Sequence, residues 1–326
     1  MNAISSATVD RPAFHNPSFT GIACGAGAGA LWGLVFLAPA LVQEFSPLLL
    51  SVTRYLCYGL IAAILIAPRM RHLAGRLSHS DWLKLALLAL LGNTLYYVLL
   101  SNAVQIGGIA MASLVIGFLP VAVTIIGSRD QGAVPLQKLA PSLLFCVAGA
   151  ACIGWQAVGQ TAGESASAQL IGLACAVGAL VSWTAFAVGN SRCLVRLRDV
   201  SAHDWNLLTG LITGVQNLLL LPVALTLGGM DHAFVDWMRF GAVAIGIAVL
   251  ASVAGNALWN RMSRLLPLTL IGQMILFETM FALIYGFLWE WRLPTMLEAI
   301  AFALVVASVL TCLSAHRKPA MAPAIA

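Results

Sequence analysis

The stretch Gly21-Ile-Ala-Cys-Gly-Ala-Gly-Ala-Gly-Ala-Leu-Trp32 returns 151 residues later as Gly172-Leu-Ala-Cys-Ala-Val-Gly-Ala-Leu-Val-Ser-Trp183, with six of twelve positions identical. Further along the chain the offset between matching residues becomes 159, at which Gly127 aligns with Gly286. About eight residues have therefore been inserted between the two matching regions. The sequence predicts two related halves.

Apolar segments long enough to cross a membrane fill most of both halves. An α-helix needs about 20 residues to span the hydrocarbon core. Charged residues make up 9% of the chain, far below the roughly 25% of a soluble domain. We therefore expect an all-α integral membrane protein and exclude a water-soluble fold. The ten predicted transmembrane helices are 19–42, 47–67, 82–103, 107–127, 139–158, 168–190, 206–227, 240–260, 267–288 and 296–314.

Basic residues indicate how these helices are oriented. With the N-terminus in the cytoplasm, 14 of the 17 Lys and Arg residues fall on the cytoplasmic side. Arg239 and Arg292 fall outside, and Arg54 lies within a helix. This excess follows the positive-inside rule. We therefore predict that both termini lie in the cytoplasm.

The two halves are predicted to be inverted relative to each other, because each contains an odd number of helices. Basic residues support this: four accompany the loop after the second helix but one follows the seventh, whereas none follows the first helix and three follow the sixth. The predicted regions are a cytoplasmic tail (1–18), a first five-helix repeat (19–158), a periplasmic linker (159–167), a second repeat (168–314) and a cytoplasmic tail (315–326). Inverted repeats are typical of secondary transporters, which alternate access to a site near the midplane.

Polar residues recur at helical spacing on corresponding faces of the two halves. Asn93, Tyr97 and Ser101 form one such stripe in the third helix, and the aligned positions in the eighth helix are also polar. The stripes line a substrate cavity in the interpretation we favour; the alternative is hydrogen bonding between packed helices. Internal aromatic residues offer flat surfaces to a substrate, with core packing as their alternative. The candidate cavity residues are Trp32, Tyr55, Tyr58, Asn93, Tyr96, Tyr97, Ser101, Trp183, Thr213, Gln216, Asn256, Trp259, Asn260, Gln273 and Glu278.

Two ionisable residues lie deep within predicted helices. Glu278 is too central to reach the membrane surface, so it must be protonated, paired or hydrated by a cavity. It either binds a substrate ammonium group or a proton, or it has a structural partner such as Tyr285, Arg54 or a polar residue. Arg54 is about two turns from the surface and can alternatively extend outward.

Glycine and proline predict local backbone geometry. Gly21, Gly25, Gly29 and Gly33 recur every four residues, a pattern that lets helix backbones approach closely. A sliding surface during transport is the second interpretation of this stripe. Pro120, midway along the predicted fourth helix, is expected to kink it.

Ten helices in two inverted halves, each opening with a glycine-rich helix that bears a tryptophan, resemble the EamA type of the drug/metabolite transporter superfamily. The segment Phe277-Glu-Thr-Met-Phe-Ala-Leu-Ile-Tyr-Gly-Phe-Leu-Trp-Glu-Trp-Arg-Leu-Pro294 is similar to the ninth helix of that family and the loop after it, including its acidic residue and proline. The corresponding loop of the first half, Ser128-Arg-Asp-Gln-Gly132, keeps less of the acidic signature. The resemblance implies peripheral fifth and tenth helices and a central cavity. Within the superfamily, the chain most resembles bacterial exporters of aromatic amino acids that also pass methyl viologen. This resemblance implies a bacterial inner-membrane exporter of small metabolites, with aromatic amino acids as the expected substrates.

Other functional classes find little support in the sequence. We expect no catalytic residues, cofactor or metal, because the chain lacks metalloprotease and nucleophile-elbow motifs and Cys-x-x-Cys spacing. No dense basic patch indicates nucleic-acid binding. The expected partners are a small-molecule substrate and the lipid bilayer, in a monomer or weak homo-oligomer. A broad-specificity drug or metabolite exporter is the alternative function, and a non-transporting scaffold or sensor is a third.

Overall fold

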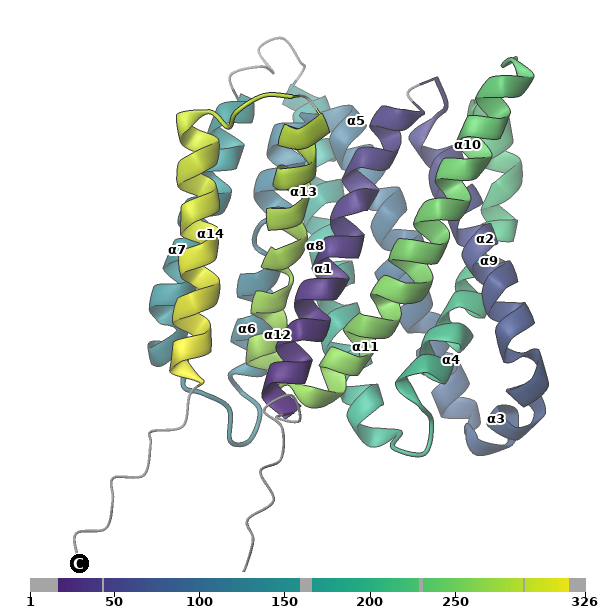
Figure 1. Cartoon of the computed structure of the whole chain (residues 1–326), viewed down its shortest axis with the longest axis horizontal. Coiled ribbons are helices and arrows are strands. Elements are labelled where there is room, and N and C mark those ends of the chain that lie inside the picture. The colour runs from purple at the N-terminus through teal and green to yellow at the C-terminus, as the bar shows by residue number, and fades with distance from the viewer. Residues whose placement is uncertain (1–16, 43, 159–165, 229–230, 290, 317–326) are drawn as a thin grey trace, which may run out of the picture.

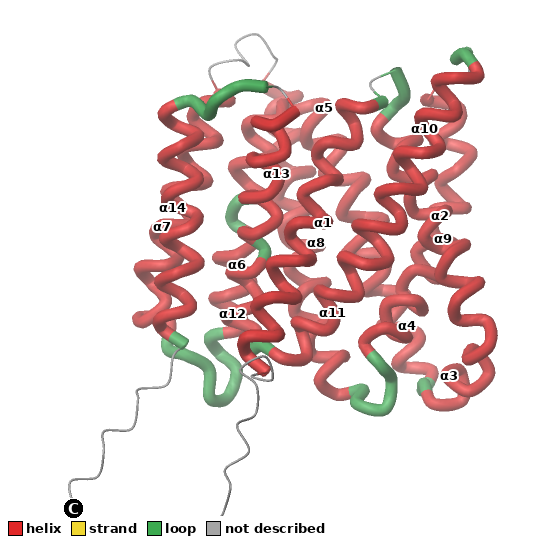
Figure 2. The backbone as a smooth tube through the Cα atoms, in the orientation of Figure 1, coloured by secondary structure: helices red, strands yellow, loops and turns green. Residues whose placement is uncertain are grey.

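The computed structural model describes the chain except for residues 1–16, 43, 159–165, 229–230, 290 and 317–326. The described residues form helices joined by short loops and contain no strand. The helices run side by side in one bundle (Figure 1), and most loops lie at its two ends (Figure 2). Eight helical segments of the described part are long and apolar enough to cross a membrane.

The first half contains α1 (Pro17–Leu41), α2 (Pro47–Ile66), the short 3-10 helix η2 (Ala67–Arg69), α3 (Met70–Arg76), α4 (His79–Ala89), the π-helix η3 (Leu90–Thr94), α5 (Leu95–Ile116), α6 (Leu119–Gly127) and α7 (Leu136–Val158). The second half contains α8 (Ala166–Arg196), α9 (Ala202–Gly228), α10 (Phe234–Ile247), the π-helix η4 (Ala248–Gly255), α11 (Asn256–Leu265), α12 (Leu268–Met274), α13 (Leu276–Trp289) and α14 (Met296–Ala315). The predicted linker 159–167 lies largely outside the described residues.

Two local predictions about the fourth helix are wrong. The loop expected at 104–106 is absent, because α5 is helical throughout Leu95–Ile116. Pro120 does not kink a continuous helix: the helix stops at 117–118, and Pro120 sits in the first turn of α6. Proline is well tolerated there, since the first turn leaves its backbone N–H groups unbonded and proline has none.

The two π-helical segments lie at corresponding places in the two halves. With the offset of 159, η3 (Leu90–Thr94) aligns with residues 249–253, which lie inside η4 (Ala248–Gly255). A π-helix is rare and is frequent at functional sites. Its occurrence at aligned positions extends the similarity of the halves from sequence to backbone geometry.

Close helix contacts are made where glycines remove side-chain bulk. α2 crosses α9 at Gly59 and Gly214, where a Cβ built on either residue would lie 2.6–2.7 Å from the Cα of the other. The α1 glycines expected to allow close packing do so: a Cβ on Gly29 or Gly33 would lie under 3.0 Å from the α13 backbone. The packing interpretation of this stripe therefore describes the structure.

Both ends of the segment from α4 to the loop after α6 lie against the last turns of α8. Asp81, in the first turn of α4, pairs with Arg196. Asp130, just after α6, accepts a bond of 2.9 Å from Arg192. Residues 81 and 130 therefore lie at the same end of the bundle.

Apolar side chains cover the outside of the bundle as well as its centre. Leu219 and Leu227 of α9 are 76% and 70% exposed, and Leu144 of α7 is 69% exposed. Water penalises so much exposed apolar surface, whereas lipid chains cover it. The exterior is therefore that of a membrane protein.

Candidate functional site

Three tryptophans meet in the largest buried cluster of the bundle. The ring centroids of Trp32 and Trp259 lie 5.0 Å apart, those of Trp183 and Trp259 5.5 Å apart, and those of Trp32 and Trp183 6.4 Å apart. All three side chains are buried. Trp32 and Trp183 are the tryptophans of the two matching sequence stretches, so the structure brings the opening helices of both halves together at one aromatic cluster.

The three indole groups differ in their hydrogen bonds. The Trp32 Nε1–H donates to Asn256 Oδ1 and to the Ala251 carbonyl, both at 3.1 Å. The Trp259 Nε1–H is buried and has no hydrogen-bond partner in the described part of the chain. Trp32 is therefore fixed to η4 and α11, whereas Trp259 is held by packing alone.

Tyrosines extend this cluster towards α2. The Tyr96 ring lies 6.4 Å from that of Trp183, and the Tyr97 ring meets Tyr55 edge to face at 6.3 Å. The guanidinium of Arg54 lies 5.1 Å from the Tyr55 ring centroid. A cation at this distance from an aromatic ring is attracted to its π-electrons.

Arg54 does not extend to the membrane surface, which was one of its two expected positions. Its side chain is buried, and its Nε–H donates to Ser252 Oγ at 3.0 Å. Ser252 belongs to η4, at the position aligned with Asn93 of η3. The arginine therefore links α2 of the first half to the π-helical segment of the second.

Glu278 lies in the first turn of α13 and is partly exposed. Its carboxylate has no hydrogen bond or ion pair with any residue that the structure describes. A cationic group within electrostatic range of it is Arg54. Tyr285, one suggested partner, instead donates to the Ala30 carbonyl at 3.0 Å. An unpaired acid deep in the membrane is characteristic of substrate, ion or proton sites.

Several other candidate cavity residues bond to neighbouring helices. Asn93 Nδ2 donates to Thr213 Oγ1 at 3.2 Å. Gln216 accepts from Thr94 Oγ1 and donates to the Ala86 carbonyl, both at 3.0 Å. These bonds join the third predicted helix to the seventh, as the packing alternative expects of such residues.

A second set of bonds holds α2, α8, α9 and α11 together. The Tyr58 hydroxyl lies 2.7 Å from Asn206 Oδ1, and Asn190 Nδ2 donates to Asn260 Oδ1 at 2.9 Å. The Trp205 indole donates to Asn190 Oδ1 at 2.8 Å. Sequence reasoning missed Asn190 and Asn206; their signal was an amide side chain in an otherwise apolar helix.

Two remaining candidates lie apart from the aromatic cluster or cannot be placed. Gln273 is fully buried in α12, where its Oε1 accepts from Ser308 of α14 at 2.9 Å and its Nε2 has no partner among the described residues. The Ser101 side chain lies outside the described residues. Within the described residues, no group of three or more His, Cys, Asp or Glu side chains is arranged to hold a metal ion.

The successive helices α12 and α13 differ in how tightly they are packed. Every residue of α12 is buried, and a Cβ on Gly272 would meet Thr124 and Pro120 of α6 at 2.6–3.1 Å. In α13, by contrast, all residues from 277 to 287 are partly exposed. Glu278 lies where this change occurs, one turn after the break between α12 and α13.

Residues 19–155 match the EamA-like transporter family. The chain is 33% identical over 302 residues to the inner membrane protein YtfF of Escherichia coli (strain K12), covering 88% of this chain and 93% of that protein. The chain belongs to the EamA-like transporter family. A solved crystal structure whose description names no function shares the fold of this transporter, with a TM-score of 0.69 over 90% of this chain and 98% of that one, at 18% identity.

Family membership confirms the resemblance at the level of the family. It makes the chain a membrane transporter. The name of the relative places that protein in an inner membrane and states no substrate.

Proposed function

We propose that this transporter is a secondary exporter of small metabolites, with aromatic amino acids as its substrates, and that it works by alternating access between two inverted five-helix halves. The observation that carries the proposal is the aromatic and charged centre formed where the halves meet. Trp32, Trp183 and Trp259 supply the aromatic surface, and Glu278 supplies a carboxylate without a partner among the described residues.

Ten membrane crossings are part of this proposal. Asp81 and Asp130 lie at the same end of the bundle, which supports an even number of crossings between them. The helices α4, η3, α5 and α6 together supply 47 residues, about 70 Å at 1.5 Å per residue. This length is enough for two crossings of a hydrocarbon core of about 30 Å.

The paired π-helices and the paired aromatic helices support the relatedness of the two halves. Ion pairs support the assignment of the periplasmic and cytoplasmic ends of the bundle. Arg239 and Arg292, the two basic residues expected outside, pair with Glu44 and Glu298, whereas Arg192 and Arg196 gather with Asp130 and Asp81 at the other end. Reporter fusions near Asp231 should read periplasmic and those in the loop after Arg196 cytoplasmic.

The amino-acid substrate is supported by charge as well as shape. The substrate ammonium group pairs with the Glu278 carboxylate. The planar side chain packs against indole and phenol rings, and such ring contacts contribute about 0.5–1.5 kcal/mol beyond area burial. The partial exposure of residues 277–287 supports entry of the substrate along α13 in this conformation.

Counterflow in proteoliposomes tests the proposal. Vesicles loaded with unlabelled tryptophan should accumulate labelled tryptophan and phenylalanine, and labelled threonine much less. Equal competition by tryptophan, methyl viologen and unrelated amines would favour a broad-specificity exporter. Absence of counterflow for every solute, by protein that is folded by size-exclusion chromatography, would refute transport of these substrates.

A further inference from the structure

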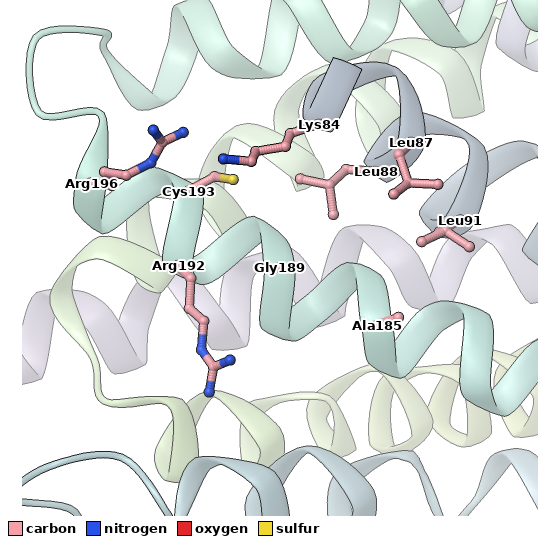
Figure 3. A pocket seen from close by; sticks show the side chains of 9 residues that line it. All are labelled: Lys84, Leu87, Leu88, Leu91, Ala185, Gly189, Arg192, Cys193 and Arg196. Atoms are coloured by element: carbon pink, nitrogen blue, oxygen red, sulfur yellow. The ribbon is translucent and has the colours of Figure 1, made fainter. Parts of the chain in front are cut away.

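A groove of about 430 Å³ lies between α4 and α8, away from the aromatic cluster. Figure 3 shows Leu87, Leu88 and Leu91 on one wall, with Ala185 and Gly189 on the facing helix. Lys84 and Arg196 stand at the same end of the groove, beside Cys193. The groove is thus apolar along its length and basic at its mouth.

The charges at the mouth do not cancel. Arg196 pairs with Asp81, and Arg192 is directed to Asp130, which accepts from it at 2.9 Å. Lys84 forms no ion pair with the residues that the structure describes. One positive charge is therefore left for an anionic ligand, and the paired Arg196 still has donor groups beside it.

The length of the groove matches one leaflet of a bilayer. Leu91 lies seven residues beyond Lys84, and Ala185 eleven residues before Arg196, which at 1.5 Å per residue correspond to about 10 Å and about 16 Å of depth. Half of a hydrocarbon core of about 30 Å is about 15 Å. The flanking side chains face lipid, since Leu87 is 53% and Val181 61% exposed.

We propose that this groove is a binding site for an anionic phospholipid of the leaflet at this end of the bundle. The phosphate lies between Lys84 and Arg196, and one acyl chain lies along Leu87, Leu91 and Ala185. A free phosphate ion would leave the apolar walls uncovered, and a zwitterionic lipid would place its own cation beside Lys84. Basic pockets between membrane helices are suited to such headgroups. The site is independent of the transported substrate.

Native mass spectrometry of the purified full-length protein tests this site. Phosphatidylglycerol should bind more tightly than phosphatidylcholine with the same acyl chains. Lys84→Gln should weaken phosphatidylglycerol binding about fivefold, the equivalent of about 1 kcal/mol for one basic residue at the surface, and leave phosphatidylcholine unchanged. Gly189→Leu should weaken both lipids, because its side chain fills the groove; the Leu88 Cδ2 that it would meet is a movable side-chain tip.

Lys138→Gln is the matched control, since Lys138 is exposed, lies just after the loop that carries Asp130 and does not line the groove. An equal loss with Lys138→Gln would overturn the proposal in favour of general charge attraction. Unchanged phosphatidylglycerol binding by Lys84→Gln would overturn it directly. Inorganic phosphate that displaces the lipid at similar concentration would show a simple anion site instead.

Discussion

Replacing Gly214 by alanine should force apart the pair of helices that joins the two halves. A Cβ on Gly214 would lie 2.7 Å from Gly59 Cα, whereas ordinary contacts begin at 3.4 Å. Gly59 and Gly214 meet through backbone atoms, so no side chain can move aside. The helices α2 and α9 must therefore separate by about 0.7 Å or bend. Overpacking of this kind costs about 1–3 kcal/mol. The same separation would strain the bond between Tyr58 and Asn206, which crosses the same interface.

Thermal unfolding in detergent, followed by tryptophan fluorescence, measures this cost. Gly214→Ala should lower the unfolding temperature by several degrees, and Gly59→Ala should do the same. Gly246→Ala is the control, because nothing lies within 4 Å of its Cβ position in α10; a helical Gly→Ala change there should be neutral or stabilising by up to about 1 kcal/mol. If Gly214→Ala unfolds at the same temperature as Gly246→Ala, the close crossing of α2 and α9 is wrong.

Three further changes test the site. Glu278→Gln should preserve folding but lower counterflow, because glutamine keeps volume and hydrogen bonding without ionising; normal transport at both acidic and neutral pH would rule out a role for its charge or proton. Trp32→Phe should destabilise the protein by about 1–3 kcal/mol, because it removes an N–H that donates to acceptors in η4 and α11. Trp183→Phe should lower the unfolding temperature less. A larger loss for Trp183→Phe would contradict the hydrogen bonds described for the cluster. Asn190→Ala should cost about 1–3 kcal/mol by leaving two buried partners unbonded, while Asn102→Ala, which removes a bond within an exposed helical turn, should unfold like the wild type.

Helix positions were predictable because lipid leaves the backbone few alternatives. A chain in hydrocarbon must satisfy its own N–H and C=O groups, so a long apolar run implies a helix. The boundaries of α1 and α14 accordingly fall within two residues of those expected. Hydropathy did not reveal the break at 117–118, because the sequence around it is apolar on both sides. The polar residues Asn102 and Gln105 favoured a loop at 104–106, where the structure has a helix.

The positions of the candidate residues were easier to predict than their contacts. Aligned stretches identified Trp32 and Trp183, and depth in the membrane identified Glu278. The sequence did not reveal which polar side chains bond to one another, because such pairs form between distant helices. Asn190 and Asn260, for example, are 70 residues apart and belong to α8 and α11.

The sequence similarity of the two halves does not extend to Gly29 and Glu278. A Cβ on Gly29 would lie 2.5 Å from Phe277 Cβ and 2.8 Å from the Glu278 backbone nitrogen, so α1 can reach this turn of α13 only with glycine there. At the matching positions of the other half, the offsets of 151 and 159 place Leu180 and Leu119. Leucine therefore stands at both matching positions, so the related pair of helices has neither the glycine nor the acid. If packing symmetry alone had set these residues, a small residue would be expected at 180 as well. The pairing indicates instead that the close approach of α1 helps to fix the position of Glu278 in the bundle.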